Sequence, residues 1–146
     1  MYQWFKLTLF ITLFSPLISV ADIAVVVHMD NPLVTLSETE IKGIYKVRQL
    51  RFPDNSPIVL SFQPDNVEIT EQFSRQVLGR SISQHSRSWT TKIFTGRMLR
   101  PKKLTNDLEV IKWVSENRGA IGYIDNANLS NAVKKIATIK SGDTAE

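Results

Sequence analysis

The fold of this chain follows from one stretch of its sequence, IAVVVH at residues 23–28. The run is continuous and rich in β-branched residues, with no alternation of polar and apolar side chains. Such a run is typical of a strand that is buried on both faces, as strands are in parallel or mixed sheets. The stretch therefore predicts an α/β domain built around a buried strand.

Two further apolar runs predict strands on either side of a helical middle region. IVLSF at residues 58–62 and AIGYI at residues 120–124 are short and bounded by turn residues. Residues 135–139 are a fourth candidate. The order of strands and helices along the chain therefore indicates a small mixed sheet with helices on both of its faces.

Four helices are predicted between these strands. Ser37 and Glu40 have the spacing of a capping box, and we interpret Asp65 with Glu68 as a second helix start of the same kind. Two more helices are expected, one over residues 83–94 and one from residue 106. The side chains expected to point inward from these two are Trp89, Ile93, Leu108, Ile111, Trp113 and Val114.

The first 21 residues have the pattern of a secretory signal peptide. Lys6 precedes an apolar run, and small residues at Ser19 and Ala21 predict cleavage after Ala21. The alternative is an uncleaved membrane anchor, but the run is interrupted by Pro16 and is short for a span, which needs about 20 residues. We therefore expect an exported, periplasmic protein with one domain over residues 22–140 and a flexible tail at residues 141–146.

The composition excludes several classes of protein. The chain has 146 residues, 42% of them hydrophobic, and no cysteine. One domain is expected, and a disulfide scaffold or a cysteine zinc site is impossible. No nucleophile elbow, metal-ligand spacing or glycine-rich phosphate loop is present. We therefore expect no cofactor, no bound metal and no enzymatic activity.

The formal net charge is +4, and the cations are concentrated in one part of the chain. No acidic residue lies between Glu71 and Asp107. Such a cluster suits an anion, an acidic partner or a lipid surface, although a solvated basic helix face is the simpler alternative. Nucleic acid is not an expected partner of an exported chain without a nucleic-acid motif. The residues predicted to form this basic partner face are Arg87, Lys92, Arg97, Arg100, Lys102 and Lys103.

Several segments together resemble the phosphate ABC transporter substrate-binding proteins. They occur in that family's order and spacing over residues 22–125. The segments are DNP at 30–32, EIKGIY at 40–45, FPDNSPI at 52–58, VLGR at 77–80, IFTG at 93–96 and GAIGY at 119–123. The resemblance implies a single lobe of the type II periplasmic-binding-protein-like fold, and phosphate or another oxyanion as the ligand.

The same resemblance places the family's anion site at the start of the helix after residue 63. In the family, an Arg and a Ser-Gly-Thr group bind phosphate there, together with backbone N–H groups and the helix dipole. Here Gln63 stands at the Arg position, and Val67-Glu68-Ile69 stand at the other three. A degenerate anion site is therefore expected. The candidate ligand contacts are Gln63, Asn66, Thr70, Arg75 and Arg80.

Two functions are compatible with these observations. The chain is either an exported domain that still binds an oxyanion, or an interaction domain that has lost phosphate binding. In the second case, its basic face would dock onto a membrane sensor, a transporter or another envelope protein. The sequence leaves open the identity of the partner and the oligomeric state.

Overall fold

The computed structural model describes residues 11–13 and 21–142. Most of the predicted signal peptide and the last four residues of the predicted tail lie outside this part. Among the described residues, no helix is long and apolar enough to cross a membrane.

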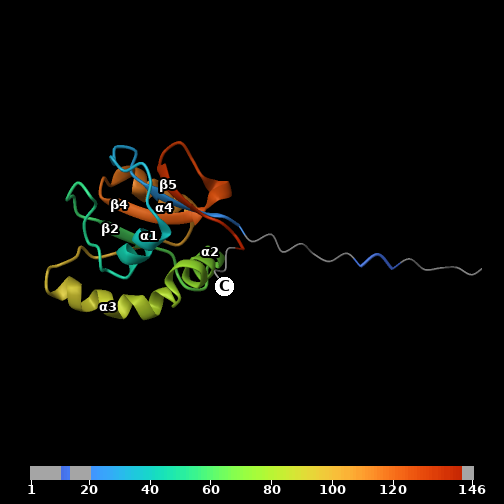
Figure 1. Cartoon of the computed structure of the whole chain (residues 1–146), viewed down its shortest axis with the longest axis horizontal. Helices are drawn as coiled ribbons and strands as arrows, with labels where there is room; N and C mark the ends of the chain where they lie inside the picture. Colours follow the sequence, from blue (N-terminus) through green and yellow to red (C-terminus); the bar gives the residue numbers. More distant parts are fainter. Residues whose placement is uncertain (1–10, 14–20, 143–146) are drawn as a thin grey trace, which may run out of the picture.

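The centre of the structure is a mixed sheet, as predicted, with five strands where the sequence indicated four candidates (Figure 1). Strand β1 (Ile23–Val27) lies between β4 (Ala120–Asp125) and β5 (Lys134–Ile139) and is antiparallel to both. Strand β2 (Val59–Phe62) is parallel to β4, and β3 (Lys102–Lys103) is parallel to β2 at the edge of the sheet. The two-residue β3 was expected to be part of a basic loop.

The continuous apolar run of β1 is explained by two cores, one on each face of the sheet. Val25 belongs to the larger core, beneath the helices of one face. Ala24 and Val26 belong to the smaller core, which Val110 and Val114 complete from the other face. All five residues of β1 are fully buried. Successive side chains of a strand point to opposite faces, so every position of this strand must be apolar.

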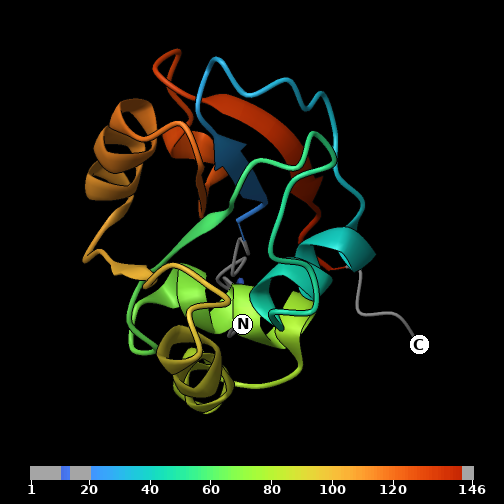
Figure 2. The same ribbon diagram turned by 90° about the vertical axis from the view of Figure 1, so that its left-hand side faces the viewer.

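The helices form two layers around the sheet (Figures 1 and 2). Helices α1 (Glu38–Tyr45), α2 (Glu68–Phe73) and α3 (Ile82–Phe94) cover one face, and α4 (Asp107–Glu116) covers the other. Helix α2 continues as a π-helical turn, η1 (Ser74–Leu78), which ends at Gly79 with φ of 70°. A short 3-10 turn, η2 (Asn126–Asn128), joins β4 to the segment before β5.

Two predicted helix starts are confirmed in detail. The Ser37 hydroxyl accepts a hydrogen bond from the backbone N–H of Glu40 at 3.1 Å, and the Glu40 carboxylate accepts one from the Ser37 N–H at 2.7 Å. Asn106 caps α4 by accepting from the Glu109 N–H at 2.9 Å. Helix α3 begins at Ile82, one residue earlier than expected, because Ser81 caps it with a capping box of its own.

Two expectations about side chains are wrong. Asp65 does not cap α2; the N-cap residue is Val67, whose side chain makes no capping bond. Leu108 does not face the core but is 77% exposed. The inward stripe of α4 is instead formed by Val110, Ile111 and Val114, and residue 108 lies outside it.

Candidate functional site

The start of α3 is occupied by a carboxylate from another part of the chain. Asp65 Oδ1 accepts a hydrogen bond from the Ile82 N–H at 2.8 Å, and Oδ2 accepts one from the Ser83 N–H at 3.2 Å. The Ser83 hydroxyl also contacts Oδ2. Backbone N–H groups at a helix start carry partial positive charge and attract anions. The chain therefore supplies its own anion at this position.

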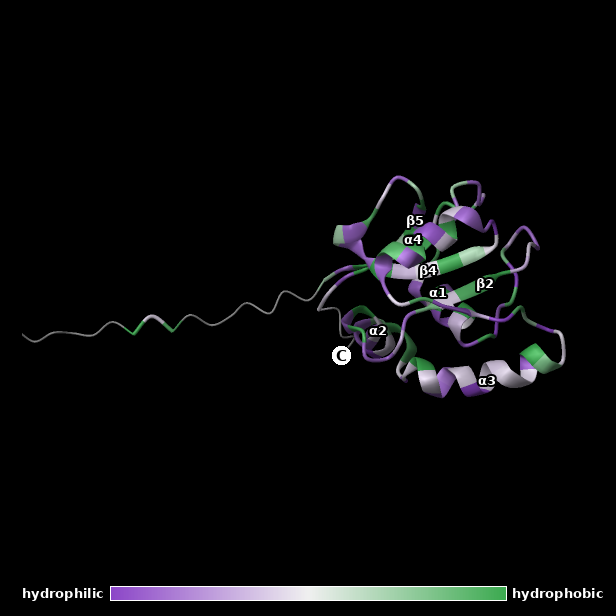
Figure 3. Cartoon of the chain, turned by 180° about the vertical axis from the view of Figure 1, so that it is seen from behind, coloured by the Kyte–Doolittle hydropathy of each residue, from purple (hydrophilic) through white to green (hydrophobic). Residues whose placement is uncertain are grey.

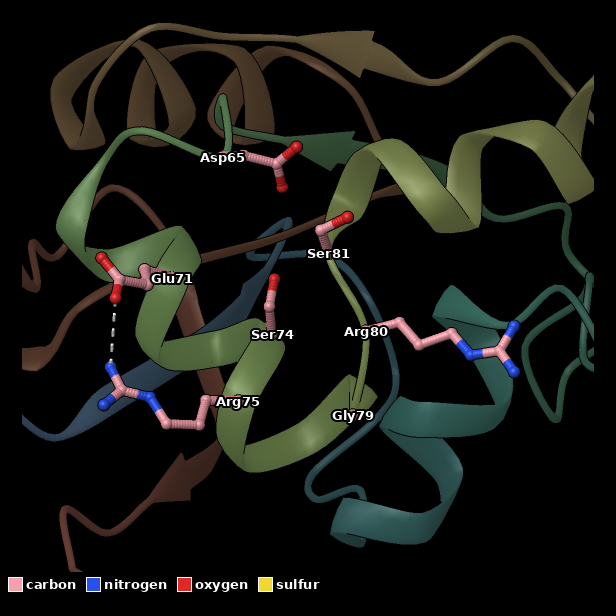
Figure 4. A pocket seen from close by; sticks show the side chains of 7 residues that line it. All are labelled: Asp65, Glu71, Ser74, Arg75, Gly79, Arg80 and Ser81. Carbon is pink, nitrogen blue, oxygen red and sulfur yellow. Dashed lines mark ion pairs between the residues drawn. The ribbon is translucent and has the colours of Figure 1, made fainter.

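A shallow pocket of about 250 Å³ adjoins this contact (Figure 4). Glu71 and Arg75, four residues apart on the helical segment that lines it, approach to 3.8 Å and are both exposed. The side chain of Arg80 extends away from Asp65, whereas Ser74 points into the gap between them. The lining residues are Asp65, Glu71, Ser74, Arg75, Gly79, Arg80 and Ser81. The guanidinium group of Arg75 is thus paired with Glu71, whereas that of Arg80 lies away from both carboxylates.

The buried Ser74 side chain is the most unusual group in this pocket. Its residue is 9% exposed, and its hydroxyl has no hydrogen-bond partner within the described part of the chain. A buried hydroxyl without a partner costs stability unless a solvent or ligand molecule reaches it. Ser74 therefore offers one polar contact to a small molecule in the pocket.

Two of the predicted ligand residues lie inside the core. The Gln63 side-chain amide donates to Asp107 Oδ1 at 2.7 Å and to the Tyr123 carbonyl at 3.2 Å, and Gln63 is only 1% exposed. The Thr70 hydroxyl donates to the Gln63 carbonyl at 3.1 Å and lies 2.8 Å from the Tyr123 hydroxyl. Asn66 is exposed and does not line the pocket. Of the five predicted contacts, the structure brings together only Arg75 and Arg80.

Tyr123 is the hub of this buried network. Its hydroxyl accepts a hydrogen bond from the Gln63 N–H at 2.9 Å, and its ring stacks on Phe73 with the ring centroids 4.2 Å apart. Burial raises the pKa of Tyr123 to about 12, against the opposing effect of the hydrogen bond with Thr70. Tyr123 is thus neutral at physiological pH and acts as a structural hydrogen-bonding group.

A model for a family described as a PBP superfamily domain matches residues 12–145 of the chain. The chain belongs to this family. The single-lobe, PBP-like α/β fold expected from the sequence is thereby confirmed. Among curated proteins, no sequence matches this PBP domain.

Several solved structures have a similar fold. A protein of Clostridium perfringens described as a phosphate ABC transporter substrate-binding protein, solved with bound phosphate, has a TM-score of 0.62 and 21% identity. An ABC-type phosphate transport receptor from Vibrio cholerae has a TM-score of 0.63 and 18% identity. PstS from Borrelia burgdorferi has a TM-score of 0.59 and 14% identity.

The PBP domain spans less than half of the length of these proteins. The matches cover 80%, 80% and 83% of this chain, but only 45%, 46% and 49% of the three solved chains in the same order. At such identities the likeness shows the fold. The ligand of those proteins is considered for this chain under the proposed function.

The predicted basic face is only partly available to a partner. Lys92 is half-buried, and its ammonium group contacts the Val47 carbonyl oxygen. The other five side chains are exposed, and none of them forms an ion pair with any residue among 21–142. The available cations are therefore Arg87, Arg97, Arg100, Lys102 and Lys103.

His85 belongs to the first turn of α3, and its side chain is on the buried side of the helix and 7% exposed. Its Nε2 atom has no hydrogen-bond partner among the described residues. Burial lowers the pKa of His85, the hydrogen bond with the Leu78 backbone opposes this, and repulsion from Lys46 and Arg80 lowers the pKa further. The PBP domain therefore holds this imidazole in its neutral form.

The role of Asp65 at the start of α3 was missed from the sequence. Its partners, Ile82 and Ser83, lie 17 and 18 residues further along the chain. The spacing of Asp65 to Glu68 suggested a local cap, and no local signal distinguishes that arrangement from the one observed. Only the packing of α3 beside the loop after β2 brings the two together.

Proposed function

We propose that this PBP domain is an exported binding domain in which the anion site of its phosphate-binding structural relatives is degenerate. In this proposal it contacts another component of the cell envelope and performs no catalysis. The proposed location is the periplasm, after cleavage of a signal peptide behind Ala21. Two structural relatives are described as proteins of phosphate transport, and a third is PstS; these relatives motivate the comparison of anion sites.

The main support for the proposal is the carboxylate of Asp65 at the start of α3. An incoming phosphate would have to displace it from two backbone N–H groups. The other nearby helix start, that of α2, carries the exposed carboxylate of Glu68 in its first turn. Two like charges about 4 Å apart repel by about 1 kcal/mol in water, and by more where water is excluded. Both helix starts therefore disfavour an added anion.

The buried side chains at residues 63 and 70 support the same proposal. At the position where the resembled family has an Arg, Gln63 is fully engaged through its amide nitrogen with Asp107 and Tyr123. Thr70 is fully buried and is used to fix the hydroxyl of Tyr123. These side chains stabilise the lobe, and neither presents a donor toward solvent.

A second candidate function is oxyanion binding in the pocket beside Asp65. It is favoured by the unpartnered hydroxyl of Ser74, with Arg75 and Arg80 on the same lining. An oxyanion there would have to compete with Glu71 for Arg75, and it would meet the charge of Asp65. These two carboxylates make this the weaker candidate.

Phosphate titration of the purified protein by isothermal calorimetry tests the proposal. We expect no saturable heat with phosphate at millimolar concentration. Saturation at micromolar phosphate, lost in an Arg75→Gln/Arg80→Gln variant, would overturn the proposal in favour of the second candidate. In parallel, the tagged protein should capture an envelope protein through its basic face, and Arg97→Gln/Arg100→Gln should weaken this capture.

A further inference from the structure

The end of α3 forms a tip on which two large apolar side chains are exposed. Phe94, the last residue of the helix, is 87% exposed, and Leu99 in the following loop is 50% exposed. Figure 3 shows the last turn of α3 as hydrophobic, on a helix that is otherwise mostly polar in colour. We call this element, residues 93–100, the α3 tip.

The α3 tip is held in place by hydrogen bonds and packing. The Arg97 N–H and the Met98 N–H both donate to the Lys92 carbonyl, at 2.9 and 3.3 Å. Ile93 and Met98 are partly buried against the larger core. Two of the four large apolar residues of the tip therefore anchor it, and the exposure of Phe94 and Leu99 is a feature of the folded loop.

The charged residues that follow Phe94 in the chain, as far as Lys103, are all cationic. Arg97 and Arg100 belong to the tip itself, and Lys102 and Lys103 follow directly in β3. A groove of about 170 Å³ runs between the tip and the segment before β2, and its lining includes Arg51, Arg97, Leu50 and Leu99. Guanidinium groups thus lie next to apolar side chains along the groove.

We propose that the α3 tip is a contact site for an anionic phospholipid surface. Phe94 and Leu99 would enter the interfacial region, while the arginines and lysines bind lipid phosphates. Exposed apolar side chains close in the chain to several cations have the chemistry of interfacial membrane binding, in which apolar burial and attraction to anionic lipid act together. An anionic lipid surface carries negative charge over a wide area. This charge is complementary to a chain segment that has no acidic residue between Glu71 and Asp107.

The position of the tip allows this contact. The start of β1 and the end of α3 lie at opposite ends of the molecule (Figure 1). The tip therefore lies far from the start of β1 in the described part of the chain. This proposal rests on the proposed function and deepens it, because it names an anionic lipid surface, and not a protein, as the envelope component that Arg97 and Arg100 contact.

A site-specific fluorescent label tests the proposal directly. The chain has no cysteine, so Phe94→Cys in the full chain gives a single labelling site for an environment-sensitive dye. The protein is purified after any cleavage by the expressing cell, and mass spectrometry identifies its first residue. A matched control is Leu108→Cys, because Leu108 is 77% exposed on α4, on the other face of the sheet.

We expect the dye at position 94, and not at position 108, to shift to the blue with phosphatidylglycerol vesicles. The shift should be absent with phosphatidylcholine vesicles and should reverse in high salt. In the unlabelled chain, each of Arg97→Gln and Arg100→Gln should weaken vesicle partitioning roughly fivefold. Phe94→Ser should weaken it roughly tenfold.

Three results would overturn the proposal. They are no shift at position 94 with anionic vesicles, an equal shift at positions 94 and 108, and a shift of the same size on neutral vesicles. The equal shift would indicate adsorption through another part of the chain. Binding of the tip to an acidic protein without any vesicle-dependent shift would assign the surface to a protein partner and reject the lipid.

Discussion

Replacing Asp65 with alanine should destabilise the domain and expose an anion-binding helix start. The carboxylate accepts two backbone hydrogen bonds, at 2.8 and 3.2 Å, and contacts the hydroxyl of Ser83. Loss of a capping side chain costs about 0.5–2 kcal/mol, and bonds to a charged group lie at the upper end of the usual range. Because Asp65 is half-buried, we expect Asp65→Ala to lower the free energy of unfolding by about 2 kcal/mol.

This change is large enough to measure by thermal unfolding. A domain of this size loses roughly 4 °C in melting temperature for each kcal/mol, so Asp65→Ala should melt about 8 °C below the parent. Asp54→Ala is the matched control, because the Asp54 carboxylate accepts only from Ser56 in its own turn, at 3.0 and 2.6 Å. We expect the control to melt within about 2 °C of the parent, as surface substitutions usually do.

The same variant tests whether Asp65 takes the place of an anion. In phosphate-free buffer the variant should be destabilised, and millimolar phosphate should restore part of the lost melting temperature. The parent and the Asp54→Ala control should show no such recovery. Equal stabilisation of all three proteins by phosphate would refute the reasoning, and so would an Asp65→Ala variant that melts with the parent.

Three further predictions concern other parts of the lobe. A Cβ at Gly122 would lie 2.7 Å from a buried serine hydroxyl and 2.7 Å from a valine methyl group, so Gly122→Ala should lower the free energy of unfolding by about 1–3 kcal/mol. Gly43→Ala, which meets nothing within 4 Å inside α1, should instead raise it by about 0.5–1 kcal/mol, as urea unfolding will show. The lowered pKa of His85 means that, as the pH falls, the unfolded chain binds a proton before the folded chain does, starting near the ordinary pKa of about 6.5. Stability should therefore fall as the pH drops from about 7 toward 5, and urea unfolding of His85→Gln should lack that slope. Val67→Ser with Glu68→Gly should create measurable phosphate binding in calorimetry if the α2 start is aligned with the anion site of the resembled family, whereas a double variant that binds no better than the parent would show that alignment to be wrong.

Local sequence patterns predicted those parts of the fold whose partners are close in the chain. The Ser37 capping box was predictable because its two hydrogen bonds join residues three positions apart. Strand β1 was predictable because burial on both faces requires every side chain to be apolar. In α4 the sequence predicted that Leu108 would point inward with Ile111 and Val114, but packing against the sheet buries Val110 instead and leaves Leu108 exposed.

The candidate site was less predictable because its contacts are distant in the chain. The position of Gln63 in the resembled family suggested a ligand contact. Its burial depends on Asp107, 44 residues later, and on Tyr123, 60 residues later. Asp65 likewise accepts hydrogen bonds at the start of α3, from Ile82, which lies 17 residues further along the chain. Polar residues after a strand are compatible with either a ligand contact or an internal bond, and the choice is made by the tertiary structure.

The strength of any phosphate binding also bears on what the lobe can do by itself. Two or three charge-assisted hydrogen bonds at one helix start, less the cost of association, correspond to an affinity near 1 mM, about 4 kcal/mol. A micromolar affinity would need about 4 kcal/mol more, and therefore contacts from a second surface. The described pocket is shallow and has its two arginines beside two carboxylates, so it does not supply them. Micromolar binding would consequently require either a second copy of the chain or another protein facing the start of α3. Such binding should raise the sedimenting mass of the protein when phosphate is added. Weak binding to a protein that stays monomeric would instead indicate that phosphate contacts the single helix start alone.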